Sequence, residues 1–520
     1  MFTTLGMDHL TSSFAEHPLD VLKTWQDWQA VGQSAALLVL CETVGGAVRD
    51  IGALMAVNQE GLHCGYMSGG CIDADLILRA QAALRSGRPQ QIRYGAGSPF
   101  IDLPLPCGGA IEVLMLPTPD TARVTQIIRA LETRQAVSVQ FHPKGAIRLG
   151  AQGGTETGAV TVTYEPKLRV RLAGRGADCL ALAKLCCASQ IEVQVFCVDD
   201  ADLDAATELG VPARALETPQ TLPVLTDDAW TAFVLMFHDR EWEGPLLSQA
   251  LSGPAFYIGA VGSHQTHAKR CAALLDSGRS DDDVKRIRGP IGLVPSLRNA
   301  SHLAISVLAE LIDAFRNRLA HRAARTAVIL LAAGQAKRFG SDDKLLAELN
   351  GQSVLSHALN ALPDLPFGPC LAVVPSLDHA RTEAFAQSAW RLLVNPNPEQ
   401  GQASSLQIGL AAIEADPSID QILILLADMP HVPARHISAL LRELTPQTPA
   451  VMSDLQPSLG PPALIKRSAF QALRGLSGDA GAKSILQDLP GLTTVPLTAR
   501  HAQDIDTPQD LNLAKALTDG

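Results

Sequence analysis

The residues most able to do chemistry in this 520-residue chain follow short apolar runs, at the points where those runs end. The run Ala327 to Ala333 opens into a loop whose small and charged residues are Gly334, Gln335, Lys337, Arg338, Gly340 and Lys344. A glycine-bounded loop that combines free backbone N–H groups with fixed cations suits the phosphates of a nucleoside triphosphate. It is not a P-loop, because its glycine spacing differs and no Gly-Lys-Ser/Thr follows. On the loop alone, an ordinary strand-to-helix turn with surface lysines stays open.

Two later stretches carry residues that could complete a nucleotide site. Asp428 closely follows the apolar run Gln421 to Leu426. A carboxylate at the end of a central strand lies where open α/β sheets bind ligands, and it is a natural ligand for Mg²⁺ beside a triphosphate. The stretch Gly401-Gln-Ala-Ser404-Ser405 lies at a predicted helix N-terminus, where hydroxyl and N–H groups can contact a base or a ribose. A plain serine N-cap is the alternative there.

Glycines and cysteines stand together in the N-terminal part. Gly69-Gly70-Cys71 precedes a predicted helix, Asp73 to Leu84, so Cys71 would lie where a helix start stabilises a thiolate and binds anions. Cys107-Gly108-Gly109 repeats the pattern before the apolar run Ala110 to Leu116. Glycines this dense between apolar runs indicate tight turns or backbone that faces a ligand. The spacing alone favours the alternative of two small buried packing cysteines.

A dinucleotide-binding pattern follows. Arg169 to Gly174 is a predicted strand, Gly176 opens a helix through Ser189, and a second strand, Ile191 to Val198, leads to Asp199. Strand, Gly-x-Gly, helix, strand and acid begin a Rossmann fold, in which the acid meets a ribose hydroxyl. The third glycine of that fingerprint is absent. The pattern therefore predicts a Rossmann-like fold and leaves the binding of a dinucleotide open.

Length and composition limit the elements that position these residues. The chain is too long for one core, so two or three domains are expected. Its 47% hydrophobic and 4% aromatic residues suit parallel sheets covered by helices. A formal net charge of −11 argues against a general nucleic-acid binder. No apolar run approaches a membrane span and no signal pattern opens the sequence, so we expect a cytoplasmic protein. The ten cysteines include no Cys-x-x-Cys pair, so we expect neither a zinc site nor a disulfide framework.

Apolar periodicity predicts further elements. We expect strands at Ala35 to Cys41, Ala232 to Phe237, Ala255 to Val261, Leu371 to Val374 and Leu392 to Val394. We expect helices at Ser353 to about Leu362 and, as one long amphipathic helix, at Asn299 to about Arg325.

The phosphate loop and Asp428 belong to a larger pattern that resembles the nucleotidyltransferases that mature the molybdenum cofactor. The similar blocks are Ala327 to Lys344, Gly401 to Ser405, Asp428-Met-Pro, Gly460-Pro-Pro-Ala-Leu, Gly478-Asp479-Ala-Gly481-Ala-Lys483 and Asp504-Ile-Asp506-Thr-Pro. Ala336 replaces the usual Ser, and Phe339 the usual Met. Ala332-Ala333-Gly334 and the Gly401 block look like the cytidylyl-transferring branch. The resemblance implies CTP as substrate and Asp506 beside Asp428 at Mg²⁺.

Residues 20 to 315 resemble the XdhC/CoxI family, accessory proteins of molybdenum hydroxylases such as xanthine dehydrogenase. The matching blocks are Gly45 to Arg49, Gly52 to Met55, Ser68 to Asp73, Cys107-Gly-Gly, Tyr257-Ile-Gly-x-x-Gly-Ser263 and Pro290-Ile-Gly-Leu293. Val48, Asp73, Ala177 and His302 depart from the family pattern. Binding tolerates such changes better than catalysis does, so the resemblance implies cofactor binding, at Gly69, Gly70, Cys71, Cys107, Gly108, Gly109, Gly174, Gly176 and Asp199.

Together the resemblances imply an α/β protein. The XdhC-like half would consist of a small α/β domain, residues 1–165, and a Rossmann-like domain, residues 166–323. A Rossmann-like nucleotidyltransferase domain of GT-A-like type would follow at residues 324–520. The implied reaction transfers CMP from CTP to the terminal phosphate of the molybdenum cofactor and releases pyrophosphate. Arg338, Lys344 and Asp428 would be catalytic. The nucleotide would be bound by Leu331, Ala332, Ala333, Gly334, Gln335, Lys337, Arg338, Gly340, Lys344, Gly401, Ser404, Ser405 and Asp428, and Mg²⁺ by Asp428 and Asp506.

The XdhC-like half would bind the finished cofactor and pass it to an apo molybdenum hydroxylase of the xanthine dehydrogenase class. No nucleic-acid or membrane partner is expected, and a homodimer stays open, as do the client enzyme and any sulfuration of the cofactor. Two other functions remain. A non-catalytic cofactor chaperone is disfavoured by the acids Asp428 and Asp506, and an NAD(P)-dependent oxidoreductase is disfavoured by the incomplete Gly-x-Gly fingerprint.

Overall fold

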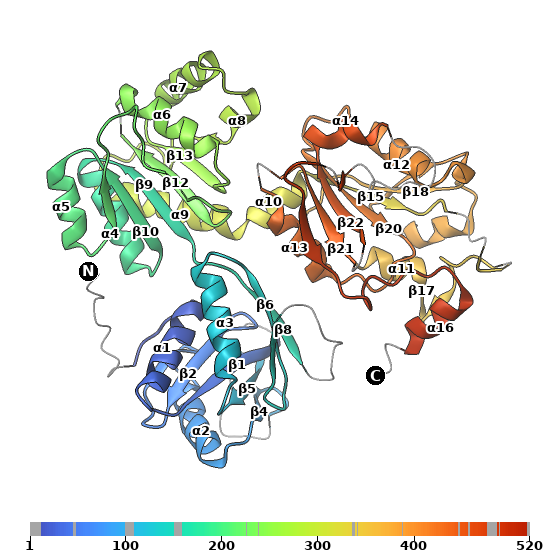
Figure 1. The fold of residues 1–520 in the computed structure, drawn as a ribbon, viewed down its shortest axis with the longest axis horizontal. Coiled ribbons are helices and arrows are strands. Elements are labelled where there is room, and N and C mark those ends of the chain that lie inside the picture. Colours follow the sequence, from blue (N-terminus) through green and yellow to red (C-terminus); the bar gives the residue numbers. More distant parts are fainter. Residues whose placement is uncertain are drawn as a thin grey trace. The chain divides into compact units, whose positions relative to one another are not determined.

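The computed structural model describes most of the chain. The described residues are 12–44, 48–98, 109–149, 159–224, 226–237, 239–334, 338–340, 342–386, 388–445, 448–455, 458–475, 486–487 and 489–516. The chain divides into two compact units, Met1–Lys167 and Leu168–Gly520 (Figure 1). Domain boundaries at 165 and 323 stay a prediction. None of the described helices is long and apolar enough to cross a membrane.

An antiparallel sheet in the order β3-β2-β1-β5-β4 forms the centre of the first unit. Its strands are β1 (Ala35–Val44), β2 (Leu54–Asn58), β3 (His63–Gly65), β4 (Gln90–Gly95) and β5 (Ala110–Leu116). A smaller sheet joins β6 (Val137–Phe141) to β7 (Ile147–Leu149) and β8 (Val160–Tyr164).

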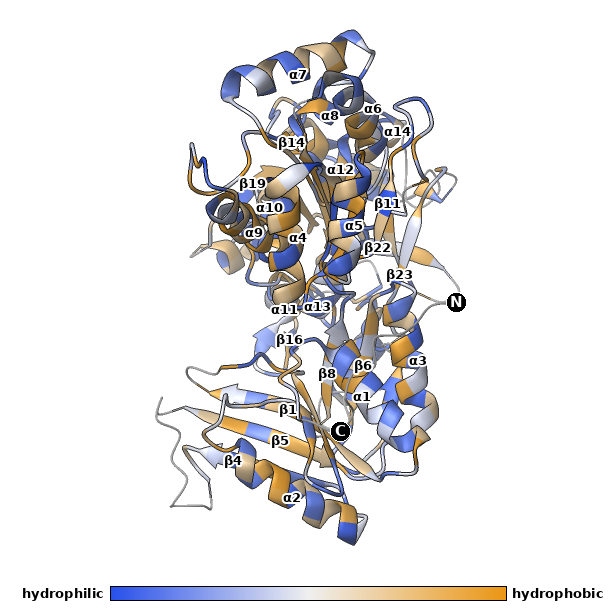
Figure 2. Ribbon diagram, turned by 90° about the vertical axis from the view of Figure 1, so that its left-hand side faces the viewer, coloured by the Kyte–Doolittle hydropathy of each residue, from blue (hydrophilic) through white to orange (hydrophobic). Residues whose placement is uncertain are grey.

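Helices cover both faces of this sheet. Leu37 and Val39 of β1 pack in one core with α1 (Pro18–Ala30) and α3 (Thr121–Glu132). Leu38 and Leu40 point the other way, into a core with α2 (Asp73–Ser86). Residues of β1 alternate between two cores, because successive side chains of a strand point to opposite faces. Figure 2 shows both hydrophobic and hydrophilic residues along α2, as expected for a helix with one buried face.

The second unit begins with a parallel sheet in the order β11-β10-β9-β12-β13-β14. Its strands are β9 (Arg169–Gly174), β10 (Glu192–Cys197), β11 (Ala213–Ala215), β12 (Thr231–Met236), β13 (Tyr257–Ala260) and β14 (Ile287–Arg288). Counted along the chain this order is 3-2-1-4-5-6, that of dinucleotide-binding Rossmann folds, so the predicted Rossmann-like fold is confirmed. Helices α4 (Gly176–Ala188) and α9 (Ala300–Arg316) cover one face, and α6 (Arg240–Leu251) and α7 (His264–Asp276) the other; α5 (Asp200–Glu208) and α8 (Asp281–Lys285) are shorter.

The single long helix predicted from Asn299 to Arg325 is wrong, because α9 ends at Arg316 and α10 (Arg318–Ala324) follows it. Asn317 lies at the break. Its side-chain amide donates to Asp313 Oδ1 at 2.7 Å. Asparagine offers the backbone alternative hydrogen bonds and so favours helix ends. The apolar periodicity continues across the break and therefore does not predict it.

The remaining chain forms a mixed sheet in the order β19-β18-β15-β20-β22-β21-β23. Its strands are β15 (Thr326–Leu331), β18 (Cys370–Val374), β19 (Arg391–Val394), β20 (Gln421–Leu426), β21 (Ala450–Asp454), β22 (Leu459–Lys466) and β23 (Thr493–Pro496). Helix α12 (Gln402–Ala411) packs on one face with Ile329, and α13 (Ala434–Glu443) on the other with Val328. The shorter elements are β16 (Glu348–Leu349), β17 (Gln352–Ser353), α11 (Val354–Leu359), η1 (Ala380–Phe385), η2 (Pro398–Gln400), η3 (Arg467–Ala469), α14 (Phe470–Leu473) and α16 (Pro508–Ala516).

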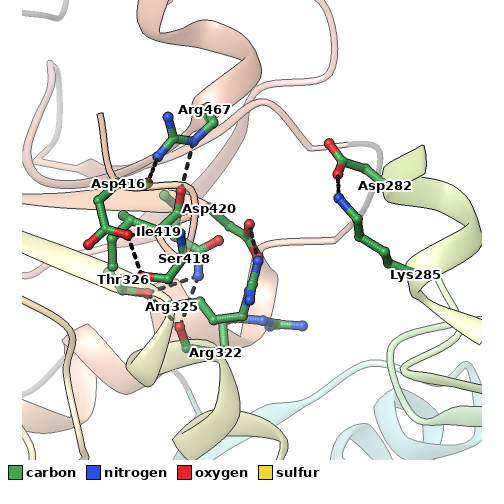
Figure 3. Close-up of polar contacts among 11 residues, drawn as sticks. Asp282, Lys285, Arg322, Arg325, Thr326, Asp416, Ser418, Ile419, Asp420 and Arg467 are labelled. Carbon is green, nitrogen blue, oxygen red and sulfur yellow. Dashed lines mark hydrogen bonds and ion pairs between the residues drawn. The ribbon is translucent and has the colours of Figure 1, made fainter. Parts of the chain in front are cut away.

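Polar contacts fix the start of β15 to the turn before β20 (Figure 3). Arg325, just before β15, donates from Nη2 to Asp420 Oδ1 at 2.6 Å. Arg467 donates from Nε to the Ile419 carbonyl at 2.7 Å. The first contact joins the residue before β15 to the residue before β20, and the second joins η3, which follows β22, to the same turn.

Candidate active site

A cavity of about 480 Å³ lies at the carboxyl ends of β15 and β20, two neighbouring parallel strands with Leu331 opposite Leu426. From β15 the chain builds β18 and β19 on one side, and then returns to β20 on the other. Open α/β sheets bind ligands where the strand order reverses in this way. The cavity is lined by Leu331, Gly334, Arg338, Lys344, Leu345, Pro398, Glu399, Gly401, Gln402, Ser405, Leu426, Asp428, Asp504 and Asp506.

Lys344 joins the two predicted metal ligands. Its Nζ donates to Asp428 Oδ2 at 2.7 Å and to Asp506 Oδ1 at 2.9 Å. The two acids are brought together partly by the backbone, because the Asp428 carbonyl accepts the N–H of Ile505 at 2.9 Å. Burial acts to lower the pKa of Lys344, but the two carboxylates outweigh it and raise that pKa above the ordinary value. Lys344 is therefore a charged ammonium between two carboxylates.

Arg338 is the more exposed of the two cations. Its Nη2 lies 2.8 Å from Asp506 Oδ2, and its side chain is 74% exposed. Asp506 itself is held in place, because the Asp510 carboxylate accepts its N–H at 3.1 Å and that of Thr507 at 2.7 Å. An exposed ion pair contributes little free energy. Arg338 can therefore leave Asp506 for a phosphate at small cost.

Asp504 is a third acid of the cavity, and it was not among the predicted site residues. Burial raises its pKa, and the negative charges of Asp428 and Asp506 raise it further. Its carboxyl group is thus easier to protonate than an ordinary aspartate. The sequence could have predicted this, because Asp504 precedes Asp506 by two residues, and side chains two apart in an extended chain point to the same side.

Arg381 ties together the two ends of the phosphate loop. From η1 its guanidinium pairs with Asp343 through Nε at 2.6 Å and Nη2 at 2.9 Å. Nη1 donates to the carbonyls of Ala332 at 2.5 Å and Gly334 at 3.1 Å. The side chain is only 4% exposed, so these bonds are shielded from water. No sequence motif marks this lone arginine, which reaches the loop only through the fold.

The serine block begins with Gly401, whose φ of 90° favours glycine and which is the N-cap residue of α12. The alternative of a plain serine N-cap is therefore wrong. The hydroxyls of Ser404 and Ser405 each accept a hydrogen bond from Asn395 Nδ2 at 2.9 Å. Ser405 lines the cavity and Ser404 does not. Asn395, which was not among the predicted site residues, therefore positions both hydroxyls.

The other predicted nucleotide-binding residues fall into three groups. Leu331 and Gly334 line the cavity, and a Cβ added at Gly334 would meet nothing within 4 Å, so the space above it is open. Ala332 and Ala333 are buried at the end of β15, and Gly340 does not line the cavity. Gln335 and Lys337 lie outside the described residues, as does the block around Gly478.

In the first unit, the loop Gly69-Gly70-Cys71 is exposed. It is shaped by Asp73, whose carboxylate accepts the backbone N–H of Met67 and Ser68 at 3.0 Å and of Gly70 at 2.7 Å. These amides are therefore already bound. The exposure of Cys71 shows that the packing alternative is wrong for this cysteine.

Of the second cysteine block, Cys107 and Gly108 lie outside the described residues, and Gly109 is buried just before β5. The Gly-x-Gly loop belongs to the other unit. There the N–H of Gly176 donates to Asp202 Oδ2 at 2.7 Å, and Asp199 lies 3.8 Å from Arg175 Nε. A dinucleotide pyrophosphate would need the N–H groups at this helix start, and an internal carboxylate already takes one of them.

The residues present fit a divalent metal ion. Asp428 and Asp506 each offer a carboxylate oxygen to one central cation, the ammonium of Lys344. Mg²⁺ prefers oxygen ligands and is often held by one or two carboxylates together with phosphates and water. In the part of the chain that the structure describes, no group of three or more metal-binding side chains was found. At a nucleotide site, phosphate oxygens and water would complete the shell.

Family models match three successive parts of the chain. The XdhC and CoxI family matches residues 28–95, the XdhC Rossmann domain residues 170–311, and the MobA-like NTP transferase domain residues 328–494. The last match contains the Lys344–Asp428 pair, and it ends before Asp506.

Curated relatives agree with these matches. The chain is 35% identical over 283 residues to the molybdenum cofactor insertion chaperone PaoD of Escherichia coli, covering 54% of this chain and 83% of PaoD. It is 31% identical over 198 residues to the purine catabolism protein PucB of Bacillus subtilis, covering 36% of this chain and 94% of PucB. It is 29% identical over 128 residues to a molybdenum cofactor guanylyltransferase of Shewanella frigidimarina, covering 24% of this chain and 61% of that enzyme.

Proposed function

We propose that this chain, which belongs to the XdhC and CoxI family and carries a MobA-like NTP transferase domain, is a cytidylyltransferase fused to a cofactor-delivery module. Its substrates are CTP and the molybdenum cofactor, and its products are molybdopterin cytosine dinucleotide and pyrophosphate. The XdhC-like part binds the cofactor and delivers it to a molybdenum hydroxylase of the xanthine dehydrogenase class.

One observation carries the transfer reaction. The cavity brings two cations, Arg338 and Lys344, and two carboxylates, Asp428 and Asp506, to the carboxyl ends of neighbouring strands. A nucleoside triphosphate needs both kinds of group, because cations hold its terminal phosphates and carboxylates hold its metal ion. Residues more than 160 apart in sequence, Lys344 and Asp506, are in direct contact there.

The chain itself performs little covalent chemistry. An oxygen of the cofactor's terminal phosphate attacks the α-phosphorus of CTP, a new P–O bond forms, and the α-phosphorus loses its bond to the oxygen that leaves with pyrophosphate. The residues align the two phosphates and offset charge on the leaving group. Mg²⁺ held by Asp428 and Asp506 would supply further positive charge at the phosphate oxygens. Lys344 and Arg338 would hold the leaving pyrophosphate and offset its negative charge.

The choice of nucleotide is the sharpest test. CTP is favoured by Ala333 and by the Gly401-to-Ser405 block, whose Ser405 faces the cavity. GTP is the competitor, because one relative is a guanylyltransferase. The purified chain is incubated with molybdenum cofactor, Mg²⁺ and each nucleotide, and pyrophosphate is followed. We expect CTP to react at least roughly tenfold faster than GTP. Equal rates or a preference for GTP would contradict the assignment of CTP. If neither nucleotide releases pyrophosphate, the result would favour the alternative function, a non-catalytic cofactor chaperone.

An NAD(P)-dependent oxidoreductase is the weaker candidate. The Gly176 N–H donates to the Asp202 carboxylate. That negative charge lies at the helix start, where a dinucleotide would place its pyrophosphate. The cofactor-binding role rests on the family and on the exposed Gly69-Gly70-Cys71 loop.

A further inference from the structure

Four acids line the cavity at the carboxyl ends of β15 and β20, and one of them differs from the other three. Asp428 and Asp506 both accept hydrogen bonds from Lys344. The negative charges of these two acids raise the pKa of Asp504, which therefore lies near them. Glu399 comes from η2 and forms no hydrogen bond or ion pair with any described residue. We propose that Glu399 contacts the base of the nucleotide, accepts a hydrogen bond from the N4 amino group of cytosine, and so selects CTP over UTP, an inference that rests on the proposed transfer from CTP.

The other charged groups of the lining indicate the phosphate end of the cavity. Arg338 and Lys344 are the two cations among the lining residues, and both form ion pairs with aspartates of the cavity. Cations, and a metal ion held by carboxylates, bind the phosphates of a nucleotide. The remaining polar lining comes from η2 and α12, which supply the side chains of Glu399, Gln402 and Ser405. With the phosphates at the first end, the base lies toward the second.

The turn that carries Glu399 is held in place by Asn395, which is only 1% exposed. Asn395 Nδ2 donates to Ser405 Oγ at 2.9 Å, and Asn395 Oδ1 accepts the N–H of Asn397 at 3.0 Å. Pro398, directly before Glu399, restricts the backbone further. The Glu399 side chain is nevertheless exposed. A fixed turn thus presents a carboxylate without a described partner to the cavity, as a binding site requires of a group that contacts the ligand.

The two pyrimidine bases differ at the atom that a carboxylate can distinguish. Cytosine carries the N4 amino group, which donates hydrogen bonds, whereas uracil carries the O4 carbonyl oxygen at the same ring position, which only accepts them. Glutamate and aspartate are the residues that accept a hydrogen bond from this amino group of cytosine. A carboxylate has no proton to offer the uracil oxygen and repels its partial negative charge. One carboxylate at this position therefore attracts CTP and disfavours UTP.

The test measures nucleotide binding by calorimetry, with the full-length chain, Mg²⁺ and either CTP or UTP. Molybdenum cofactor is left out, so no transfer occurs during the titration. We expect the unchanged chain to bind CTP at least roughly tenfold more tightly than UTP. Glu399→Gln supplies an amide N–H that can donate to the uracil oxygen, so UTP should bind more tightly than before, and the two affinities should differ by less than about threefold. A side chain that only stabilised η2 would not produce this gain in affinity for UTP.

Glu348→Gln is the matched control, because Glu348 is an exposed glutamate of β16 that does not line the cavity. It should keep the preference of the unchanged chain, and the melting temperature shows that each variant is folded. The inference is overturned if the unchanged chain binds CTP and UTP equally, if neither binds, if Glu399→Gln keeps the full preference, or if Glu348→Gln loses it. A failure of the proposed function looks different: the preference for CTP would depend on Glu399, but no pyrophosphate would form when molybdenum cofactor is added.

Discussion

At the scale of single residues, the candidate active site is built from charges that compensate one another. Lys344 is 8% exposed and contacts two carboxylates, so removing the ammonium would leave Asp428 and Asp506 without their partner. A buried charge without its partner costs several kcal/mol. Substitutions in this group therefore change stability as well as chemistry, and the informative ones keep the size of the side chain.

Asp428→Asn is the first such change. It removes one metal ligand and leaves Lys344 paired with Asp506, so we expect transfer to fall by roughly 100-fold or more with little loss of stability. Pyrophosphate release measures the transfer rate, Mn²⁺ binding measures the loss of the metal ligand, and the melting temperature measures stability. Asp504→Asn is the control, because Asp504 does not contact Lys344 through any described hydrogen bond and should keep most of the metal affinity. If Asp428→Asn retains more than about a tenth of the rate, Asp428 is not a primary ligand.

Arg381→Lys tests the tie across the phosphate loop. Lysine cannot make the two-bond contact with Asp343 and the bonds to Ala332 and Gly334 together, so the loop should bind CTP less well. We expect KM for CTP to rise roughly tenfold, while kcat changes less, because Arg381 does not line the cavity. Arg391→Lys, an exposed arginine of β19, is the control. A lower melting temperature with an unchanged KM would show that Arg381 only stabilises the fold.

At the scale of elements, local patterns predicted the strands better than the ends of helices or the contacts between segments. The prediction for β20 is confirmed residue for residue, because a buried parallel strand is a continuous apolar run. The break at Asn317 was missed, since one polar residue interrupts an apolar stripe without altering its period. Asp428 and Asp506 were found inside sequence blocks. Arg381 was not, because it meets Asp343 only after β18 has paired with β15.

The contacts that hold the turn before β20 give an element-scale prediction (Figure 3). Arg467 donates to backbone carbonyls on the turn before β20, including those of Ile419 at 2.7 Å and Glu414 at 3.0 Å. Arg467→Ala should therefore destabilise the chain by roughly 2 kcal/mol, since several partly buried carbonyls would lose their donor at once. Lys285→Ala removes a surface pair with Asp282 whose side chains are 74% and 93% exposed, and it should have almost no effect. Equal shifts in denaturation midpoint would contradict this ranking.

Packing of α13 predicts a dependence of stability on pH. Burial, with the positive charges of His501 and Arg435 adding to it, lowers the pKa of His436 from 6.5 to about 4. Between these values the unfolded chain binds a proton that the folded chain does not, so stability falls as the pH falls from 6.5 towards about 4. The full effect of such a shift is roughly 3 kcal/mol. His436→Gln should flatten the decline of the melting temperature over that range.

The flattening should be partial, because burial also lowers the pKa of His17 and of His501 to about 4. Exposed His302→Gln is the control and should leave the slope of melting temperature against pH unchanged. An unaltered slope in His436→Gln would mean that this histidine is not the group that titrates.

At the scale of the whole molecule, the proposed function assigns nucleotidyl transfer and cofactor retention to different units of the chain. The phosphate- and metal-binding candidates lie between Gly334 and Asp506, in the unit Leu168–Gly520. The exposed Gly69-Gly70-Cys71 loop belongs to the other unit and has no acid–base pair among its described contacts. This division predicts that damage to one function spares the other.

Cys71→Ala in the full chain tests that division. The loop is held by Asp73 through three backbone N–H groups and not by the thiol, so the variant should fold normally. We expect it to retain several-fold less molybdenum cofactor per folded molecule and to release pyrophosphate within about twofold of the normal rate. Cys187→Ala, which changes another exposed cysteine, should alter neither quantity. Unchanged cofactor retention in Cys71→Ala would remove Cys71 from the binding site. A loss of pyrophosphate release as large as that of Asp428→Asn would show that both units contribute to one site, and the proposed division would then be wrong.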